Sequence, residues 1–271
     1  MKRLFFWFLL TVSLSAKVTV AVSIAAEEYL AKRVGGDLVE VFTLSPKNSS
    51  SHQYEPKMAD MKLISRADLY LACGVEFERS WLKRFASNAP KMRIVHLDRK
   101  IERSAERKFD THIWFSTENM RLMAEETVRA LMIADPANSA IYLQNGSKTI
   151  NEIDQVKKYI DGKLNGYRGR IFLTDHPAFG FFADEFGLRQ LSIEIDHHEP
   201  KPRDIQAIIK VAKEKNIKTI FAEKNMAHKI ADTIADAIGA KVVELELVSS
   251  DWANQMIDIA DSFERAFDES N

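Results

Sequence analysis

The chain has little cysteine, little net charge and no long hydrophobic run. Its 271 residues include one cysteine, Cys73, which excludes an intramolecular disulfide and a metal site built on several thiolates. The 38 basic and 39 acidic residues give a net charge of −1, so the composition indicates no basic surface for nucleic acid. Because 46% of the residues are hydrophobic, a substantial core is still expected. Any metal site must therefore use histidines and carboxylates.

The N-terminal segment has the pattern of a secretory signal peptide. Residues 1–3 are positively charged, residues 4–12 are apolar, and residues 13–16 resemble a cleavage site. The apolar run is shorter than the roughly 20 residues that span a bilayer. No cysteine follows it to carry a lipid. We therefore expect residues 1–16 to be removed, leaving an exported, soluble protein that is not lipid-anchored.

After the signal peptide, strand-like and helix-like segments alternate, which predicts an α/β fold with mainly parallel sheets. The predicted strands are residues 18–23, 38–43, 69–72, 93–97, 170–174, 191–195, 219–222 and 241–247. The predicted helices between and after them are residues 25–34, 78–85, 179–186, 203–215, 227–238 and a last one capped by Asp251.

A long helix interrupts this alternation near the middle of the chain. Asp135 and Pro136 are typical of a helix start, and apolar residues then recur at three- and four-residue spacing as far as Leu164. Such a helix would be roughly 43 Å long, and Asn145-Gly146 could kink or split it. We predict an N-terminal lobe (17–135), a connecting helix (136–166) and a C-terminal lobe (167–271).

The common catalytic motifs are absent from the sequence. It contains no G-x-S-x-G, H-E-x-x-H, G-x-x-x-x-G-K-[ST] or G-x-G-x-x-G pattern. Nucleophilic hydrolases, zincins, P-loop NTPases and dinucleotide-binding enzymes therefore have no local support. The seven histidines are the remaining candidates for chemistry.

Three histidines lie in loops where a ligand is expected. His176 follows the predicted strand 170–174, and open parallel sheets bind ligands at the carboxyl ends of their strands. His112 is a polar residue among bulky apolar ones, and His52 ends a polar loop before a predicted helix. Separations of 60 and 64 residues exclude a local metal-binding motif. The fold would have to assemble such a site, most naturally in a cleft between the lobes.

The segments around these histidines resemble those of a known family. Residues 51–56 (SHQYEP), 110–114 (DTHIW) and 174–182 (TDHPAFGFF) are similar to the three histidine segments of periplasmic zinc and manganese solute-binding proteins of metal ABC transporters. Further similar stretches are residues 135–138 (DPAN) and 199–205 (EPKPRDI). The resemblance extends over essentially the whole chain after the signal peptide.

This resemblance implies two α/β lobes bridged by a helix, with a metal held between them by His52, His112 and His176. The family often places an aspartate after a strand of the second lobe, where this chain has Glu246. We predict Glu246 as the fourth ligand, with Asp251 or a water molecule as alternatives. Glu246 shares one face of its predicted strand with Glu244, so both could instead be solvated surface residues.

The predicted ligands favour zinc over manganese. Three neutral imidazoles suit zinc, whereas manganese sites use more carboxylate. The resemblance implies that manganese-type members of the family have a glutamate at the position of His176. His197 and His198 could bind a second ion weakly or form a solvated turn. His96 and His228 are interpreted as structural.

The predicted function is high-affinity capture of zinc in the periplasm and delivery to the membrane permease of an ABC transporter. We expect a monomer that is not an enzyme and does not bind nucleic acid. One alternative is a mononuclear zinc hydrolase, which needs an open coordination position and a general base such as Glu223. Others are a metal-binding surface adhesin, and a siderophore or cobalamin binder with an aromatic cleft and no converging histidines.

Overall fold

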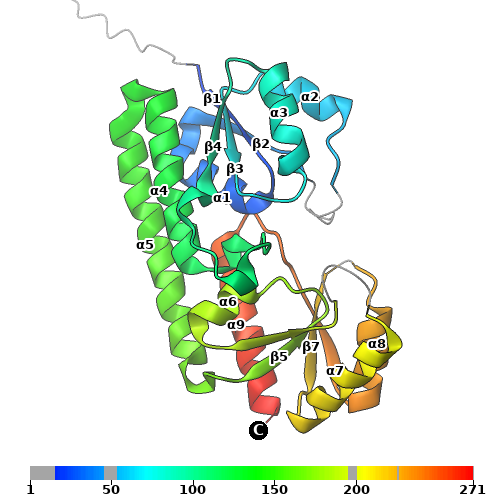
Figure 1. Cartoon of the computed structure of the whole chain (residues 1–271). Coiled ribbons are helices and arrows are strands. Elements are labelled where there is room, and N and C mark those ends of the chain that lie inside the picture. The colour runs from blue at the N-terminus through cyan, green and yellow to red at the C-terminus, as the bar shows by residue number, and fades with distance from the viewer. Residues whose placement is uncertain (1–15, 46–53, 195–199, 225, 271) are drawn as a thin grey trace, which may run out of the picture.

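Two parallel four-stranded sheets form the frame of the molecule (Figure 1). The computed structural model describes residues 16–45, 54–194, 200–224 and 226–270. The N-terminal sheet consists of β1 (Val18–Val22), β2 (Val39–Thr43), β3 (Leu69–Ala72) and β4 (Arg93–His96). The C-terminal sheet consists of β5 (Ile171–Thr174), β6 (Arg189–Ser192), β7 (Thr219–Glu223) and β8 (Lys241–Leu245). The predicted fold class is therefore confirmed.

The strand order of the two sheets determines where ligands can bind. The orders are β2-β1-β3-β4 and β6-β5-β7-β8, and every pairing is parallel. In each sheet the chain moves outward in one direction from the first strand and then returns to continue on its other side. A crevice opens at the carboxyl ends of the strands on either side of such a switch point. In the C-terminal sheet the switch point lies beside β5. His176 follows the carboxyl end of β5 by two residues.

Helices cover the sheets and connect the lobes. They are α1 (Ala25–Gly35), α2 (Met58–Ile64), α3 (Glu78–Asn88), α4 (Thr117–Ala134), α5 (Ser139–Leu164), α6 (Gly180–Phe186), α7 (Pro202–Glu214), α8 (Lys229–Ile238) and α9 (Trp252–Glu269). Helix α4, which was not predicted from the sequence, packs beside α5 (Figure 1).

The long helix α5 extends along both lobes, as predicted, but begins at Ser139 (Figure 1). Residues Pro136–Asn138 form a separate 3₁₀ turn, and the Asp135 carboxylate accepts hydrogen bonds from the Asn138 amide and the Tyr142 hydroxyl. The helix continues through Gly146 without a break. A β-carbon there would lie 2.2 Å from Val128 Cγ2, so the missing side chain allows α4 and α5 to approach closely.

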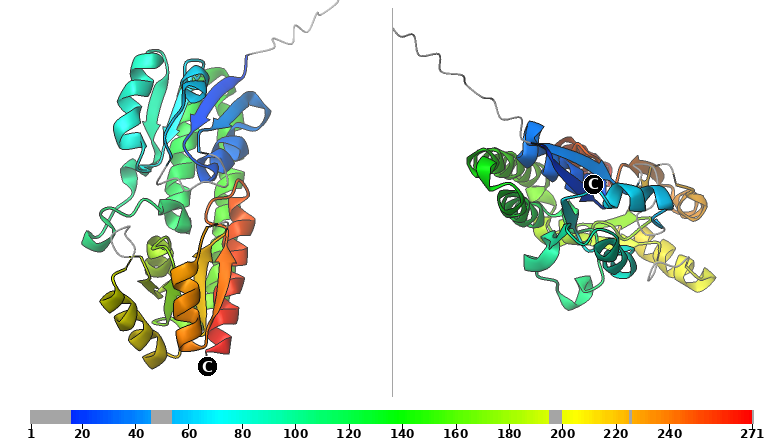
Figure 2. Two further views of the ribbon diagram at one scale, coloured as in Figure 1. Left: turned by 90° about the vertical axis from the view of Figure 1, so that its right-hand side faces the viewer. Right: turned by 90° about the horizontal axis from the view of Figure 1, so that it is seen from above.

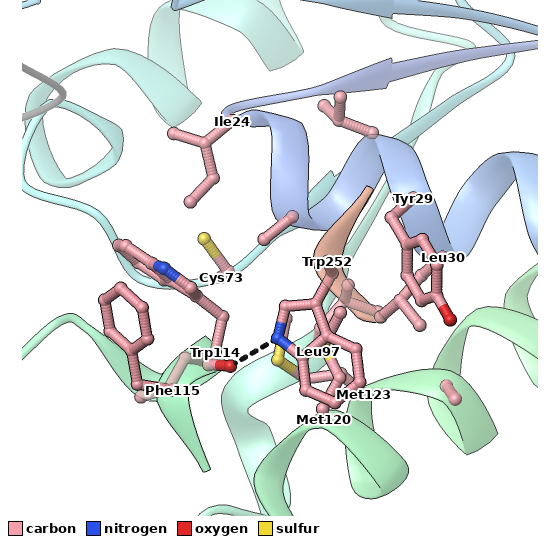
Figure 3. Close-up of a cluster of buried hydrophobic side chains, with 14 of the residues drawn as sticks. Ile24, Tyr29, Leu30, Cys73, Leu97, Trp114, Phe115, Met120, Met123 and Trp252 are labelled. Atoms are coloured by element: carbon pink, nitrogen blue, oxygen red, sulfur yellow. Dashed lines mark hydrogen bonds between the residues drawn. The ribbon is translucent and has the colours of Figure 1, made fainter. Parts of the chain in front are cut away.

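The last helix makes a second connection between the lobes. Trp252, the first residue of α9, is fully buried among N-terminal side chains, and its indole Nε1–H donates to the Trp114 carbonyl at 2.7 Å (Figure 3). Trp114 in turn donates from Nε1 to the Leu247 carbonyl at 3.0 Å. From this point α9 runs down the C-terminal lobe (Figure 2). One hydrophobic core therefore extends from Val18 in β1 to Phe267 in α9.

A smaller second core lies within the C-terminal lobe. It is formed by side chains of β5, β7, α7 and α8, with Ile220 and Ile234 completely buried. Within the described part of the chain, no helix has both the length and the apolar character needed to cross a membrane.

Candidate metal centre

The fold brings two of the three predicted histidine ligands together. His176 lies in the loop after β5, and His112 immediately precedes a 3₁₀ turn (Ile113–Phe115) of the N-terminal half. Although 64 residues separate them, their Nε2 atoms are 3.1 Å apart. His112 is buried, with 3% of its surface exposed, and His176 is half-buried. The pair is therefore largely shielded from solvent.

Each of these histidines is oriented by a carboxylate. The Nδ1 atom of His112 is 2.9 Å from Asp110 Oδ1, and that of His176 is 2.6 Å from Glu194 Oε2. A carboxylate partner favours the proton on Nδ1, so that Nε2 is the nitrogen with which a neutral ring would bind a metal ion. This carboxylate–histidine arrangement is typical of zinc sites in proteins.

The facing nitrogen atoms suit a tetrahedral metal ion. With each Nδ1 beside a carboxylate, two Nε2 atoms 3.1 Å apart are joined either by a hydrogen bond, with a proton on one of them, or by a metal ion that replaces this proton. Zinc–nitrogen bonds of about 2.0–2.1 Å in a tetrahedron place two nitrogens roughly 3.3 Å apart, close to the observed separation. His112 and His176 can therefore act as two ligands of one ion with little rearrangement.

The segment that carries His112 is fixed against the C-terminal lobe. Arg107 donates from Nε and Nη2 to the two Asp184 oxygens at 2.9 and 3.2 Å. The Thr117 backbone N–H and hydroxyl both donate to Glu185, which also lies in α6. A side chain at Gly180 would meet Asp110, since its β-carbon would lie 2.5 Å from Oδ2. The position of His112 thus depends on contacts with α6.

The other predicted ligands are not brought to this pair within the described chain. His52 lies outside the described residues, as do His197 and His198. Glu246 is exposed and lines a hollow of about 380 Å³ with Asp251 and Lys224. Neither His112 nor His176 lines this hollow. His52 and Glu246 as ligands therefore stay predictions.

The remaining candidate residues are dispersed. His96 is exposed at the end of β4, with Nδ1 3.9 Å from Asp98. Glu223, the base required by a hydrolase, is half-buried at the carboxyl end of β7. His228 lies beside Asp175, the residue before His176.

The carboxylate partners Asp110 and Glu194 were not predicted. Asp110 could have been found, because an Asp two residues before a ligand histidine can reach the same ring. Glu194 follows the neighbouring strand β6, and its backbone N–H donates to the Asp175 carbonyl at 3.0 Å. That placement depends on the pairing of β5 with β6, which no local sequence pattern specifies.

A second acidic cluster lies in the N-terminal core. Ligand atoms of Glu27, Cys73 and Glu78 lie within 4.8 Å of one another, and all three residues are buried. Glu78 accepts hydrogen bonds from the Cys73 and Gly74 backbone N–H groups, and Glu27 accepts from those of Ser23 and Ile24. Burial raises the pKa of Glu78 to about 7 and that of Glu27 well above 4.5. Carboxyls that hold the strand ends in this way have a structural role.

Comparison with known proteins identifies the family. The family model of the zinc-uptake complex component A, periplasmic (ZnuA), matches residues 20–266. The chain belongs to this family. The family resemblance expected from the three histidine segments is thereby confirmed.

Individual ZnuA-like proteins agree in both sequence and fold. A crystal structure of ZnuA superimposes with a TM-score of 0.88 at 29% identity, covering 92% of this chain and 99% of that one. The high-affinity zinc uptake system protein ZnuA of Bacillus subtilis is 26% identical over 230 residues, 78% of this chain and 72% of its own. The manganese ABC transporter substrate-binding lipoprotein PsaA of Streptococcus mitis is 25% identical over 238 residues, 81% of this chain and 75% of its own.

Proposed function

We propose that this ZnuA-family protein captures zinc between its lobes and delivers it to the permease of a metal ABC transporter. Family membership makes it a metal-binding component of an uptake system. The observation that carries the proposal is the pair of Nε2 atoms 3.1 Å apart, each on a ring held by a carboxylate. The family consists of solute-binding proteins, so a zinc hydrolase that uses Glu223 has no supporting observation.

The proposed ligands are His52, His112 and His176, with Glu246, Asp251 or water in the fourth position. His112 and His176 are supported by their geometry and His52 by the resemblance of residues 51–56 to a ligand segment. A fully occupied coordination shell suits tight binding for transport, whereas catalysis would require an open position.

Zinc is the proposed cargo because the donors at the paired site are imidazole nitrogens. Nitrogen-rich tetrahedral sites suit zinc, while manganese prefers additional carboxylate oxygens. The family includes relatives named for either metal, so this choice depends on the donors of this chain. We also propose that the mature protein is a periplasmic monomer without a lipid anchor.

Metal capture should depend on pH because each ligand histidine must be neutral. We expect zinc affinity to fall as the pH drops through roughly 6.5. A metal that binds only the folded protein also raises its stability in proportion to the logarithm of metal concentration.

The proposal can be tested on the protein purified without residues 1–16. Excess zinc should raise the melting temperature, and native mass spectrometry with equimolar zinc and manganese should show the zinc form. His112→Ala should abolish tight zinc binding, while His96→Ala, a change at an exposed histidine, should preserve it. An unchanged melting temperature in zinc, together with unaltered zinc binding by His112→Ala, would refute the proposal.

A further inference from the structure

His228 has the same carboxylate-backed arrangement as the two paired histidines. Its Nδ1 atom is 3.3 Å from Asp175 Oδ2. The other ring nitrogen, Nε2, is buried and makes no hydrogen bond with any part of the chain that the structure describes. A neutral ring with its proton on Nδ1 therefore directs an unused lone pair from Nε2. This is the state in which a histidine binds a metal ion.

A second potential ligand lies next to that lone pair. Glu244 Oε1 is 3.6 Å from His228 Nε2, beyond hydrogen-bond distance but close to the roughly 3.3 Å between two ligands of tetrahedral zinc. The Glu244 side chain is 53% exposed, whereas that of His228 is 9% exposed. Glu244 thus connects the buried nitrogen with solvent.

The surroundings of Glu244 attract cations. Glu244 lines the hollow of about 380 Å³ that also contains Glu246, Asp251 and Asp258, and Lys224 is the only basic residue among its described lining. Carboxylates that line one concave surface raise the local concentration of cations. The same hollow contains Gln255, whose Nε2 donates to the Glu246 carbonyl at 2.6 Å, so that its Oε1 is held as an acceptor.

We infer that His228 Nε2 and Glu244 form a second, weaker binding position for zinc, which ions enter from the acidic hollow. Two protein ligands and water complete the coordination, so affinity is lower than at a site with three histidines. Asp175 orients His228 and directly precedes His176, which places the second position beside the proposed transport site. The inference goes beyond the proposed function, because it requires neither His112 nor His176 as a ligand.

The test is zinc stoichiometry of the mature chain, measured by equilibrium dialysis at about pH 7.5, where histidine is neutral. The wild type should bind one zinc tightly and a second more weakly. Glu244→Gln and His228→Ala should each weaken the second step at least about tenfold and leave the first unchanged. His96→Ala should change neither step. Glu244→Gln alters a half-exposed surface group, so its result does not depend on refolding.

Nitrogen NMR of the histidine rings provides a second measurement. Added zinc should shift the Nε2 resonance of His228 in the wild type and leave it unshifted in Glu244→Gln. The inference is overturned if both nitrogens of His228 carry protons at this pH in the presence of zinc, which indicates an imidazolium between Asp175 and Glu244. It is also overturned if the second zinc binds both variants normally. If the wild type showed the weaker binding step but no tight one, the proposed function would be refuted instead.

Discussion

At the scale of single residues, the carboxylates behind the histidines determine how the candidate site can bind a metal. Asp110 and Glu194 each contact the Nδ1 atom of one histidine. Asp110 also accepts the backbone N–H of His112 at 3.0 Å, so it fixes both the ring and the chain that carries it. The chemistry of His112 and His176 therefore depends on groups that need not contact the metal themselves.

We predict that Asp110→Asn lowers zinc affinity by about 10- to 100-fold. The amide is a weaker acceptor and no longer stabilises the tautomer with the proton on Nδ1. Competition titration with a zinc chelator measures the change. Glu106→Gln, an exposed change in the same segment, serves as the control and should bind zinc like the wild type. Equal affinities for Asp110→Asn and the control would show that another contact orients His112.

A second prediction at this scale concerns the buried acidic cluster. The pKa of Glu27 is raised above its ordinary value of 4.5 by burial and by the neighbouring Glu78. The protonated carboxyl therefore stabilises the fold fully below pH 4.5, and this stabilisation is lost as the pH rises through the raised pKa. Glu27→Gln retains an acceptor for Ser23 and Ile24 and does not ionise.

We expect the free energy of unfolding of the wild type to fall, relative to Glu27→Gln, as the pH rises from about 5 to 8. Urea unfolding of both proteins at several pH values measures this difference. The comparison cancels the titration of the histidines, which both proteins share. Parallel pH profiles would mean that Glu27 is already ionised in the folded protein.

At the scale of elements, the antiparallel helices α4 and α5 approach each other closely at Gly146. Gly146 of α5 faces Val128 of α4, and a β-carbon at 146 would lie 2.2 Å from Val128 Cγ2. Gly162, on the same helix, has no atom within 4 Å of such a carbon. The two glycines provide a matched comparison of the same substitution in crowded and open surroundings.

We predict opposite effects of alanine at these positions. Gly162→Ala should stabilise the protein by up to about 1 kcal/mol, because alanine has the higher helix propensity. Gly146→Ala should destabilise it, since crowding costs about 1–3 kcal/mol against the same gain. Chemical denaturation measures both. Stabilisation by both substitutions would show that Val128 moves aside without cost.

At the scale of the whole molecule, the larger of the two hydrophobic cores extends through both lobes. Trp252 lies in the N-terminal part of this core, although it begins the helix that packs on the C-terminal sheet (Figure 3). The lobes are therefore connected twice, by α5 and by the buried start of α9. A core common to both lobes limits independent motion, because separating them would expose buried aromatic rings.

We therefore predict that metal-free protein unfolds in a single cooperative transition. Calorimetry should give equal calorimetric and van't Hoff enthalpies, and circular dichroism and tryptophan fluorescence should show the same midpoint. Trp252→Ala should destabilise the protein by about 3–5 kcal/mol through loss of a fully buried side chain. Two resolved transitions in the wild type would show that the lobes are independent.

Much of the fold could be predicted because it depends on local patterns. Apolar alternation and helix signals identified the strands and the connecting helix, since burial and hydrogen bonding produce a different period in each element. Helix α4 was missed because its start signal is a single serine without a capping box. Ser116 accepts from the Asn119 backbone N–H as its cap, but it follows the apolar run of residues 113–115.

The candidate site, too, could be predicted from the sequence only in part. His112 and His176 could be selected from the sequence because each is a polar residue in a loop at the end of an element, and the family resemblance is likewise a property of short segments. Only the tertiary structure placed their Nε2 atoms together, supplied Glu194 from beside β6, and put Glu246 in a hollow that neither histidine lines. These placements depend on strand order and on the packing of α6 and α9, which are long-range contacts that no local pattern encodes.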